Sequence, residues 1–198
     1  MLVCRHGRLC LQAATGRALN TEYSLNRSSA YSGVDPTPFI RAAQRVLNPE
    51  VGVHGPEKGA GSLFEEFGVT PGRGLNLDVP SAPEGSSYIT YSFKNSSNEV
   101  VYVGRASGPG TPRQVLAGRL SKGHDHFTEG LTPEVVDVQG SKLASQGAEE
   151  VFVQGYREQG AKLSNIDEAL SYKNSERIQR SLNKIEAYIE DLERRGLR

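Results

Sequence analysis

The sequence predicts an α+β protein in which helices flank a small central three-stranded antiparallel sheet, preceded by an irregular N-terminal segment. Two observations predict this class. Glycine and proline recur throughout residues 1–86, whereas residues 87–198 alternate β-rich runs with runs of helical periodicity, in the order β-β-α-β-α-α. We therefore expect an irregular connector or wrapping segment over residues 1–86 and a folded domain over residues 87–198.

The composition excludes several classes of protein. The 198 residues include 23 basic and 23 acidic side chains, so the chain is not a polycationic binder and needs a local patch to bind nucleic acid. No apolar run approaches the roughly 18 residues of a membrane-spanning helix, and residues 1–11 lack the continuous apolar core of a signal peptide. The two cysteines, Cys4 and Cys10, are too few for a structural zinc site.

Helical structure is expected at two places in the irregular segment. Residues 37–47 carry Pro38 in the first turn and apolar side chains on one face, which predicts one helix. A short helical turn is expected over residues 63–67. The rest of the segment is dominated by turn-forming residues, and no chemistry is predicted for it.

A β-hairpin is expected at the start of the folded domain. Residues 88–93 and 100–103 are rich in aromatic and β-branched side chains, and the polar residues 94–98 between them suit a hairpin loop. Gly104 is expected to end the second strand.

The remaining elements are one strand and three helices. Pro112 suits the first position of a helix that Thr111 caps. Val135, Val136 and Val138 predict a short third strand, and helical periodicity predicts helices over residues 144–159 and 174–195. The last of these has the strongest apolar stripe.

Basic and polar side chains gather in the stretch that follows the hairpin. The stretch from Tyr102 to His126 contains four basic residues and one acidic residue, which gives it a net charge of +3 before either histidine is protonated. Such a patch suits phosphate groups. The candidate nucleic-acid-binding residues are Arg105, Arg113, Lys122 and His126.

The polar residues of this half of the chain, taken one at a time, also have ordinary structural explanations. Tyrosines in a hairpin usually pack, with the hydroxyl at the surface, and a helical arginine is usually solvated or ion-paired. The His124–His126 stretch suits a polar loop. Glu149 and Glu150 near a helix start would be favoured by the helix dipole alone. Considered together, the order and spacing of these tyrosines, arginines, histidines and glutamates favour a functional site over separate structural roles.

The hairpin sequence SSYITYSFKNSSNEVVYVG resembles the GIY-YIG nuclease family, whose first two strands bear those tripeptides. Tyr91 falls at the tyrosine of the first tripeptide and Tyr102, Val103 and Gly104 match the second, with the two tyrosines 11 residues apart. The resemblance covers roughly residues 87–170. Ile89 stands where the family has the first glycine.

The resemblance continues beyond the hairpin. The family places an arginine, often followed by a histidine, on its first helix, which corresponds to Arg119 and His124, with Arg113 as the rival arginine. The family's metal-binding glutamate corresponds to Glu149 in EEVFVQGY. A downstream asparagine of the family corresponds to Asn165.

The resemblance implies a metal-dependent endonuclease that hydrolyses phosphodiester bonds in DNA, or in RNA. It implies Mg²⁺ or Mn²⁺ held by Glu149, charge stabilisation by Arg119, a general base at Tyr91 and positioning by Tyr102, with His124 relaying a proton or binding phosphate. The loop RASGPGTPRQVLAGRL is similar to nuclease domains of bacterial polymorphic toxins. That similarity implies a secreted or injected effector, acting in the cytoplasm of the target cell and neutralised by a cognate immunity protein.

A second hypothesis assigns the same fold to a non-catalytic module that binds nucleic acid or a protein. Its basis is Ile89 in place of the family's glycine. Such a module would bind in the presence of a chelator and would cleave nothing. The nuclease hypothesis is preferred because the residues for all four polar roles occur in the family's order.

Overall fold

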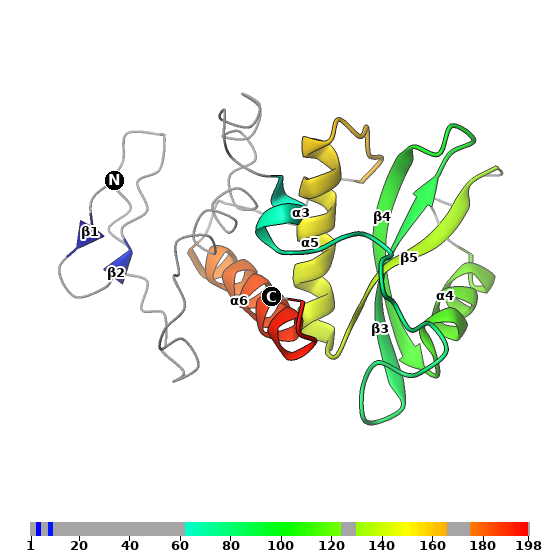
Figure 1. Ribbon diagram of the computed structural model, residues 1–198, viewed down its shortest axis with the longest axis horizontal. Helices are drawn as coiled ribbons and strands as arrows, with labels where there is room; N and C mark the ends of the chain where they lie inside the picture. Colours follow the sequence, from blue (N-terminus) through cyan, green and yellow to red (C-terminus); the bar gives the residue numbers. More distant parts are fainter. Residues whose placement is uncertain (1–2, 5–7, 10–61, 124–129, 166–174, 198) are drawn as a thin grey trace. The chain divides into compact units, whose positions relative to one another are not determined.

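The computed structural model of the chain describes residues 3–4, 8–9, 62–123, 130–165 and 175–197 (Figure 1). All statements on structure below refer to these residues. None of the described helices is long and apolar enough to cross a membrane.

The chain divides into two units, residues 1–36 and residues 37–198. In the first unit, strands β1 (Val3–Cys4) and β2 (Arg8–Leu9) pair in antiparallel fashion. The second unit thus begins well ahead of residue 87, where the sequence places the start of the folded domain. It holds all the other elements described here.

A three-stranded antiparallel sheet forms the centre of the second unit (Figure 1). Its strands are β3 (Ser86–Lys94), β4 (Val100–Pro109) and β5 (Thr132–Gln139), in the spatial order β4-β3-β5. Residues 89–93 of the central strand are all buried, because helices cover both faces of the sheet. The predicted α+β class is therefore confirmed.

The hairpin of β3 and β4 has the predicted loop and a longer second strand than predicted. The side chain of Asn95 accepts hydrogen bonds from the backbone amides of Ser97 and Glu99, which closes the loop. The prediction that Gly104 ends the strand is wrong, since β4 continues to Pro109 with Gly104 paired to Tyr91. Gly104 does not end the strand; it allows the side chains of Tyr91 and Tyr102 to pack closely against the backbone of β4.

Helix α4 (Pro112–Ser121) lies on one face of the sheet (Figure 1). Thr111 caps it as predicted, in a capping box with Gln114. Val115 of this helix packs in a core cluster with apolar side chains of β3 and β5, among them Ile89 and Phe93.

Helices α5 (Lys142–Glu158) and α6 (Ser175–Arg194) lie on the opposite face (Figure 1). Both match the predicted helices to within two residues at each end. The two helices approach closely at Gly147, where a side chain would collide with the backbone carbonyl of Lys184. The apolar stripe of α6 is buried against α5 and the sheet, as shown by Ile185, Tyr188, Ile189 and Leu192.

The short helix α3 (Leu63–Glu66) confirms the helical turn expected over residues 63–67. Its aromatic residues belong to the main core, because Phe64 packs against Phe152 of α5 and Phe67 stacks on Tyr188 of α6. The described residues ahead of β3 thus contribute to the core of the unit. The helix expected over residues 37–47 lies outside the described residues.

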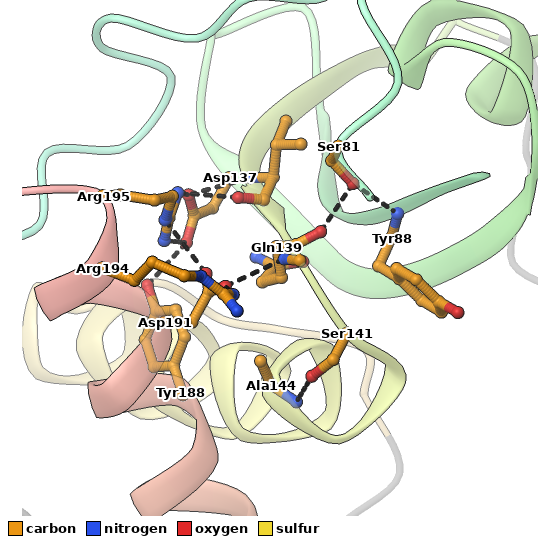
Figure 2. A network of polar contacts seen from close by, with 12 residues as sticks. Ser81, Tyr88, Asp137, Gln139, Ser141, Ala144, Tyr188, Asp191, Arg194 and Arg195 are labelled. Carbon is orange, nitrogen blue, oxygen red and sulfur yellow. Dashed lines mark hydrogen bonds and ion pairs between the residues drawn. The ribbon is translucent and has the colours of Figure 1, made fainter. Parts of the chain in front are cut away.

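A buried polar network joins the end of α6 to β5 (Figure 2). The carboxylate of Asp137 accepts hydrogen bonds from the Tyr188 hydroxyl at 2.6 Å and from Nη1 of Arg195 at 2.7 Å. Asp191 accepts one from the amide of Gly140 at 2.9 Å and lies 3.0 Å from Nε of Arg195. The network fixes α6, and through it α5, relative to the sheet.

Candidate active site

Tyr91 lies at the centre of β3, where it is paired with Gly104 on β4 and with Val135 on β5. Its side chain is 1% exposed and contacts the rings of Phe93 and Tyr102. A Cβ atom on Gly104 would lie 2.8 Å from the Tyr91 hydroxyl oxygen, which is closer than carbon and oxygen can approach. Glycine at this position therefore lets the phenol reach across β4.

The Tyr91 hydroxyl meets two other polar groups that the sequence singled out. It forms side-chain hydrogen bonds with Arg119 and with Tyr102. Burial raises the pKa of Tyr91, and the nearby Arg119 guanidinium offsets part of that rise. Burial likewise raises the pKa of Tyr102, with a further contribution from Tyr91. Both phenols are therefore protonated at neutral pH.

The structure brings Arg119, not its rival Arg113, to the tyrosines. The two positions are six residues apart on α4, so their side chains project in different directions. Arg113 is exposed at the start of the helix and pairs with Asp78 at 3.2 Å. Arg119 lies in the last turn and is partly buried beside Tyr91.

Glu149 reaches the site from α5. That helix begins at Lys142, so Glu149 lies about two turns from its start. At that distance the helix dipole does not account for a carboxylate at this position. Its carboxylate Oε2 is 2.8 Å from Nε of Arg105 on β4, and the two side chains are 28% and 39% exposed. Burial raises the pKa of Glu149, which Arg105 and then Lys184 partly offset. The negative charge of Glu149 also raises the pKa of Tyr91 and of Tyr102.

These side chains form one site at the edge strand of the sheet. We call it the candidate site and define it as Tyr91, Tyr102, Arg119 and Glu149, contributed by β3, β4, α4 and α5. Four separate elements supply four groups of the predicted types, and each group acts electrostatically on at least one of the others.

Asn165 secures the part of β4 that carries Tyr102 and Gly104. Its side-chain oxygen accepts a hydrogen bond from the amide of Val103 at 3.0 Å, and its side-chain nitrogen donates one to the carbonyl of Val103 at 2.7 Å. The amide thus occupies the outer edge of β4 as a neighbouring strand would. These hydrogen bonds of Asn165 hold the backbone of the strand on which Tyr102 lies.

The other predicted binding residues have different placements. Lys122 is exposed at the C-terminal end of α4, next to Gly123. His124 and His126 lie outside the described residues. Arg105 lies beside Glu149, where it is ion-paired and still accessible to solvent. Of the predicted basic patch, Arg105 and Arg119 therefore lie at the candidate site.

Two charged groups near Glu149 were not predicted as part of a site. Glu150 is buried, and burial together with the Glu149 charge raises its pKa to about 7 despite the nearby Lys184. Lys184 acts on both carboxylates from α6. Only the close contact of α5 and α6 at Gly147 places this lysine there, and no sequence pattern reports that contact.

The donors present fit a hard divalent cation that retains most of its water. The described part of the chain contains no group of three or more His, Cys, Asp or Glu side chains arranged to hold a metal. Mg²⁺ commonly binds proteins through one or two carboxylates, with water and substrate phosphate completing its shell. The partly exposed carboxylate of Glu149 can serve in that way.

Comparisons with protein-family models, with curated proteins and with solved structures each found no match to this chain. The candidate site therefore rests on its own geometry.

Proposed function

We propose that this chain is a metal-dependent endonuclease of the GIY-YIG type that hydrolyses phosphodiester bonds in DNA. The observation that supports it is the convergence of Tyr91, Tyr102, Arg119 and Glu149 from four elements at one end of α4 and one edge of the sheet. Packing alone does not require two phenols, a guanidinium and a carboxylate to meet.

Arg119 supplies fixed positive charge beside the tyrosines. A guanidinium held by a helix and by a phenol is preorganised to stabilise the charge that develops on a phosphate in the transition state. Glu149 would hold Mg²⁺ or Mn²⁺, which when bound polarises the phosphate and stabilises the leaving oxygen.

Tyr91 and Tyr102 act on the attacking water. To act as a general base, Tyr91 must first release its phenolic proton to solvent, and the phenolate would then accept a proton from the attacking water. Burial, which raises the pKa of Tyr91, opposes the first step, and Arg119 lowers its cost. Tyr102, hydrogen-bonded to Tyr91, orients the water or the phosphate.

The exposed cations around the site fit a polyanionic substrate. Arg105 lies on β4 and Lys122 directly follows α4, while Arg113 is exposed at the start of α4, where it pairs with Asp78. RNA offers the same phosphates and is the other substrate class. Delivery as a secreted effector, action in the target-cell cytoplasm and neutralisation by an immunity protein are proposals that rest on the sequence resemblance alone.

The test is plasmid cleavage by the purified chain with Mg²⁺, with Mn²⁺ and with EDTA. Glu149→Gln should lower the cleavage rate at least about 100-fold, since it removes the anionic ligand while preserving shape. Glu190→Gln, which removes an exposed carboxylate from α6, is the matched control and should cleave at the wild-type rate. Full cleavage by Glu149→Gln, or cleavage in EDTA, would refute the metal-dependent assignment.

One observation favours the second candidate function, a non-catalytic binding module. Tyr91 is 1% exposed and held by an aromatic cluster, as a packing residue is. Such a module predicts binding to DNA that persists in EDTA, and no product with any divalent ion. Metal-dependent product formation excludes it.

A further inference from the structure

The ion pair between Arg105 and Glu149 involves the one carboxylate to which the proposed function assigns the metal. Nε of Arg105 lies 2.8 Å from Oε2 of Glu149, which is a direct charge-assisted hydrogen bond. The other charged group that lowers the pKa of Glu149 is also a cation, Lys184. In the chain without metal, the negative charge of Glu149 is therefore already balanced.

The two partners of this pair differ in how firmly the surrounding residues hold them. Glu149 projects from the middle of α5, where the flanking residues Ala148 and Glu150 are buried and fix the helix. Arg105 is a long side chain on the edge strand, 39% exposed, and its guanidinium can turn toward solvent without disturbing the core. If one partner must leave the pair, it is Arg105.

We propose that Arg105 occupies the metal's position on Glu149 and is displaced when a divalent cation binds. This inference rests on the proposed function, since it takes Glu149 as the metal ligand. A cation and a guanidinium compete for the same oxygen because each needs its negative charge, and their own charges repel. The displaced guanidinium is then free to pair with a phosphate.

The exchange couples metal binding to substrate binding. Before exchange, Arg105 and Glu149 neutralise each other, so this pair adds no net charge to that of Arg119 at the candidate site. After exchange, the net charge of the metal, Glu149 and Arg105 together is +2, of which the metal with its carboxylate carries +1 and the released guanidinium +1. Phosphate binding should therefore be tighter in the metal-loaded chain, and metal binding tighter in the presence of nucleic acid.

The test measures the affinity of the full chain for Mn²⁺ alone, without nucleic acid, by titration calorimetry. Arg105→Gln removes the competing charge and should bind Mn²⁺ about three- to tenfold more tightly than the wild type. Arg73→Gln is the matched control, because it removes an equal charge from an exposed side chain ahead of β3 that is not part of the candidate site, and it should bind as the wild type does. Glu149→Gln should lose the binding.

Equal or weaker binding of Mn²⁺ by Arg105→Gln, in a variant that melts at the wild-type temperature, would overturn the inference. If the wild type binds Mn²⁺ through Glu149 and cleaves DNA in that case, only the competition is refuted. If the wild type neither binds Mn²⁺ nor cleaves any nucleic acid, the proposed function fails as well. The two failures are therefore distinguishable.

Discussion

At the scale of single residues, the candidate site depends on a glycine, which has no side chain, at position 104. Gly104 lies opposite Tyr91 in the β3–β4 pairing, and its hydrogen atoms leave the space through which the phenol passes. The sequence marks this glycine as a strand terminator, which is how a glycine after a β-rich run is commonly interpreted. Its real role depends on the residue across the strand pair, which a linear pattern does not contain.

Gly104→Ala should therefore destabilise the fold by about 1–3 kcal/mol, because the methyl group collides with the Tyr91 phenol and with the Tyr102 ring. Urea unfolding measures the loss. Gly118→Ala is the control, since it lies in α4 with no atom near the added methyl group, and it should be neutral or stabilising by up to about 1 kcal/mol. Equal stabilities for the two variants would contradict the close approach.

At the scale of elements, the candidate site is held together by the attachment of the helices to the sheet. The carboxylate of Asp137 on β5 binds Tyr188 and Arg195 at the end of α6 (Figure 2). Helix α6 in turn packs closely on α5, which carries Glu149. Asp137 is 3% exposed, so its charge is tolerated only because both partners are in place.

Asp137→Ala should lower the free energy of unfolding by about 1–3 kcal/mol, since it leaves the buried Tyr188 hydroxyl without its acceptor and removes one of the two carboxylates that pair with Arg195. Denaturant titration gives the value. Asp78→Ala removes a carboxylate from an exposed ion pair, 78% accessible on the Asp78 side, and should change stability by less than about 1 kcal/mol. A loss of under about 1 kcal/mol for Asp137→Ala would show that the network does not anchor α6.

At the scale of the whole molecule, the burial of four tyrosines couples their ionisation to unfolding. Burial raises the pKa of Tyr91, Tyr102, Tyr156 and Tyr188, and in Tyr188 the neighbouring Asp137 raises it further. In the unfolded chain these phenols return to a pKa of about 10. Above that pH the unfolded state releases protons that the folded state retains.

The folded state should thus keep its full stability from neutral pH to about pH 10 and lose it as the pH rises further. Each nearly inaccessible phenol, Tyr91 at 1% and Tyr188 at 0% exposed, contributes a fall of up to about 1.4 kcal/mol per pH unit. Phenolate absorbance followed during alkaline titration checks this. These tyrosines should ionise only in a cooperative step that coincides with loss of circular dichroism; gradual, non-cooperative ionisation of all tyrosines would contradict it.

Local patterns predicted most of the elements, and contacts between distant segments account for what they missed. The β3–β4 hairpin, the Thr111 cap and the stripe of α6 follow from neighbouring residues, so the sequence shows them directly. Resemblance identified the tyrosines, Arg119 and Glu149 as a set, which the structure brings together. The pairing of Arg105 with Glu149 joins residues 44 positions apart through the docking of α5 on β4, and no sequence period reports it.

The double hydrogen bond of Asn165 to Val103 also bears on the solubility of the protein. An open strand edge presents amide and carbonyl groups that can pair with the edge of another chain, which leads to aggregation. β4 is an edge strand, and Ser164 and Asn165 bind the backbone of Val101 and Val103 along its outer side. The same contacts thus hold β4 at the candidate site and block this stretch of its edge against pairing with a strand of another chain.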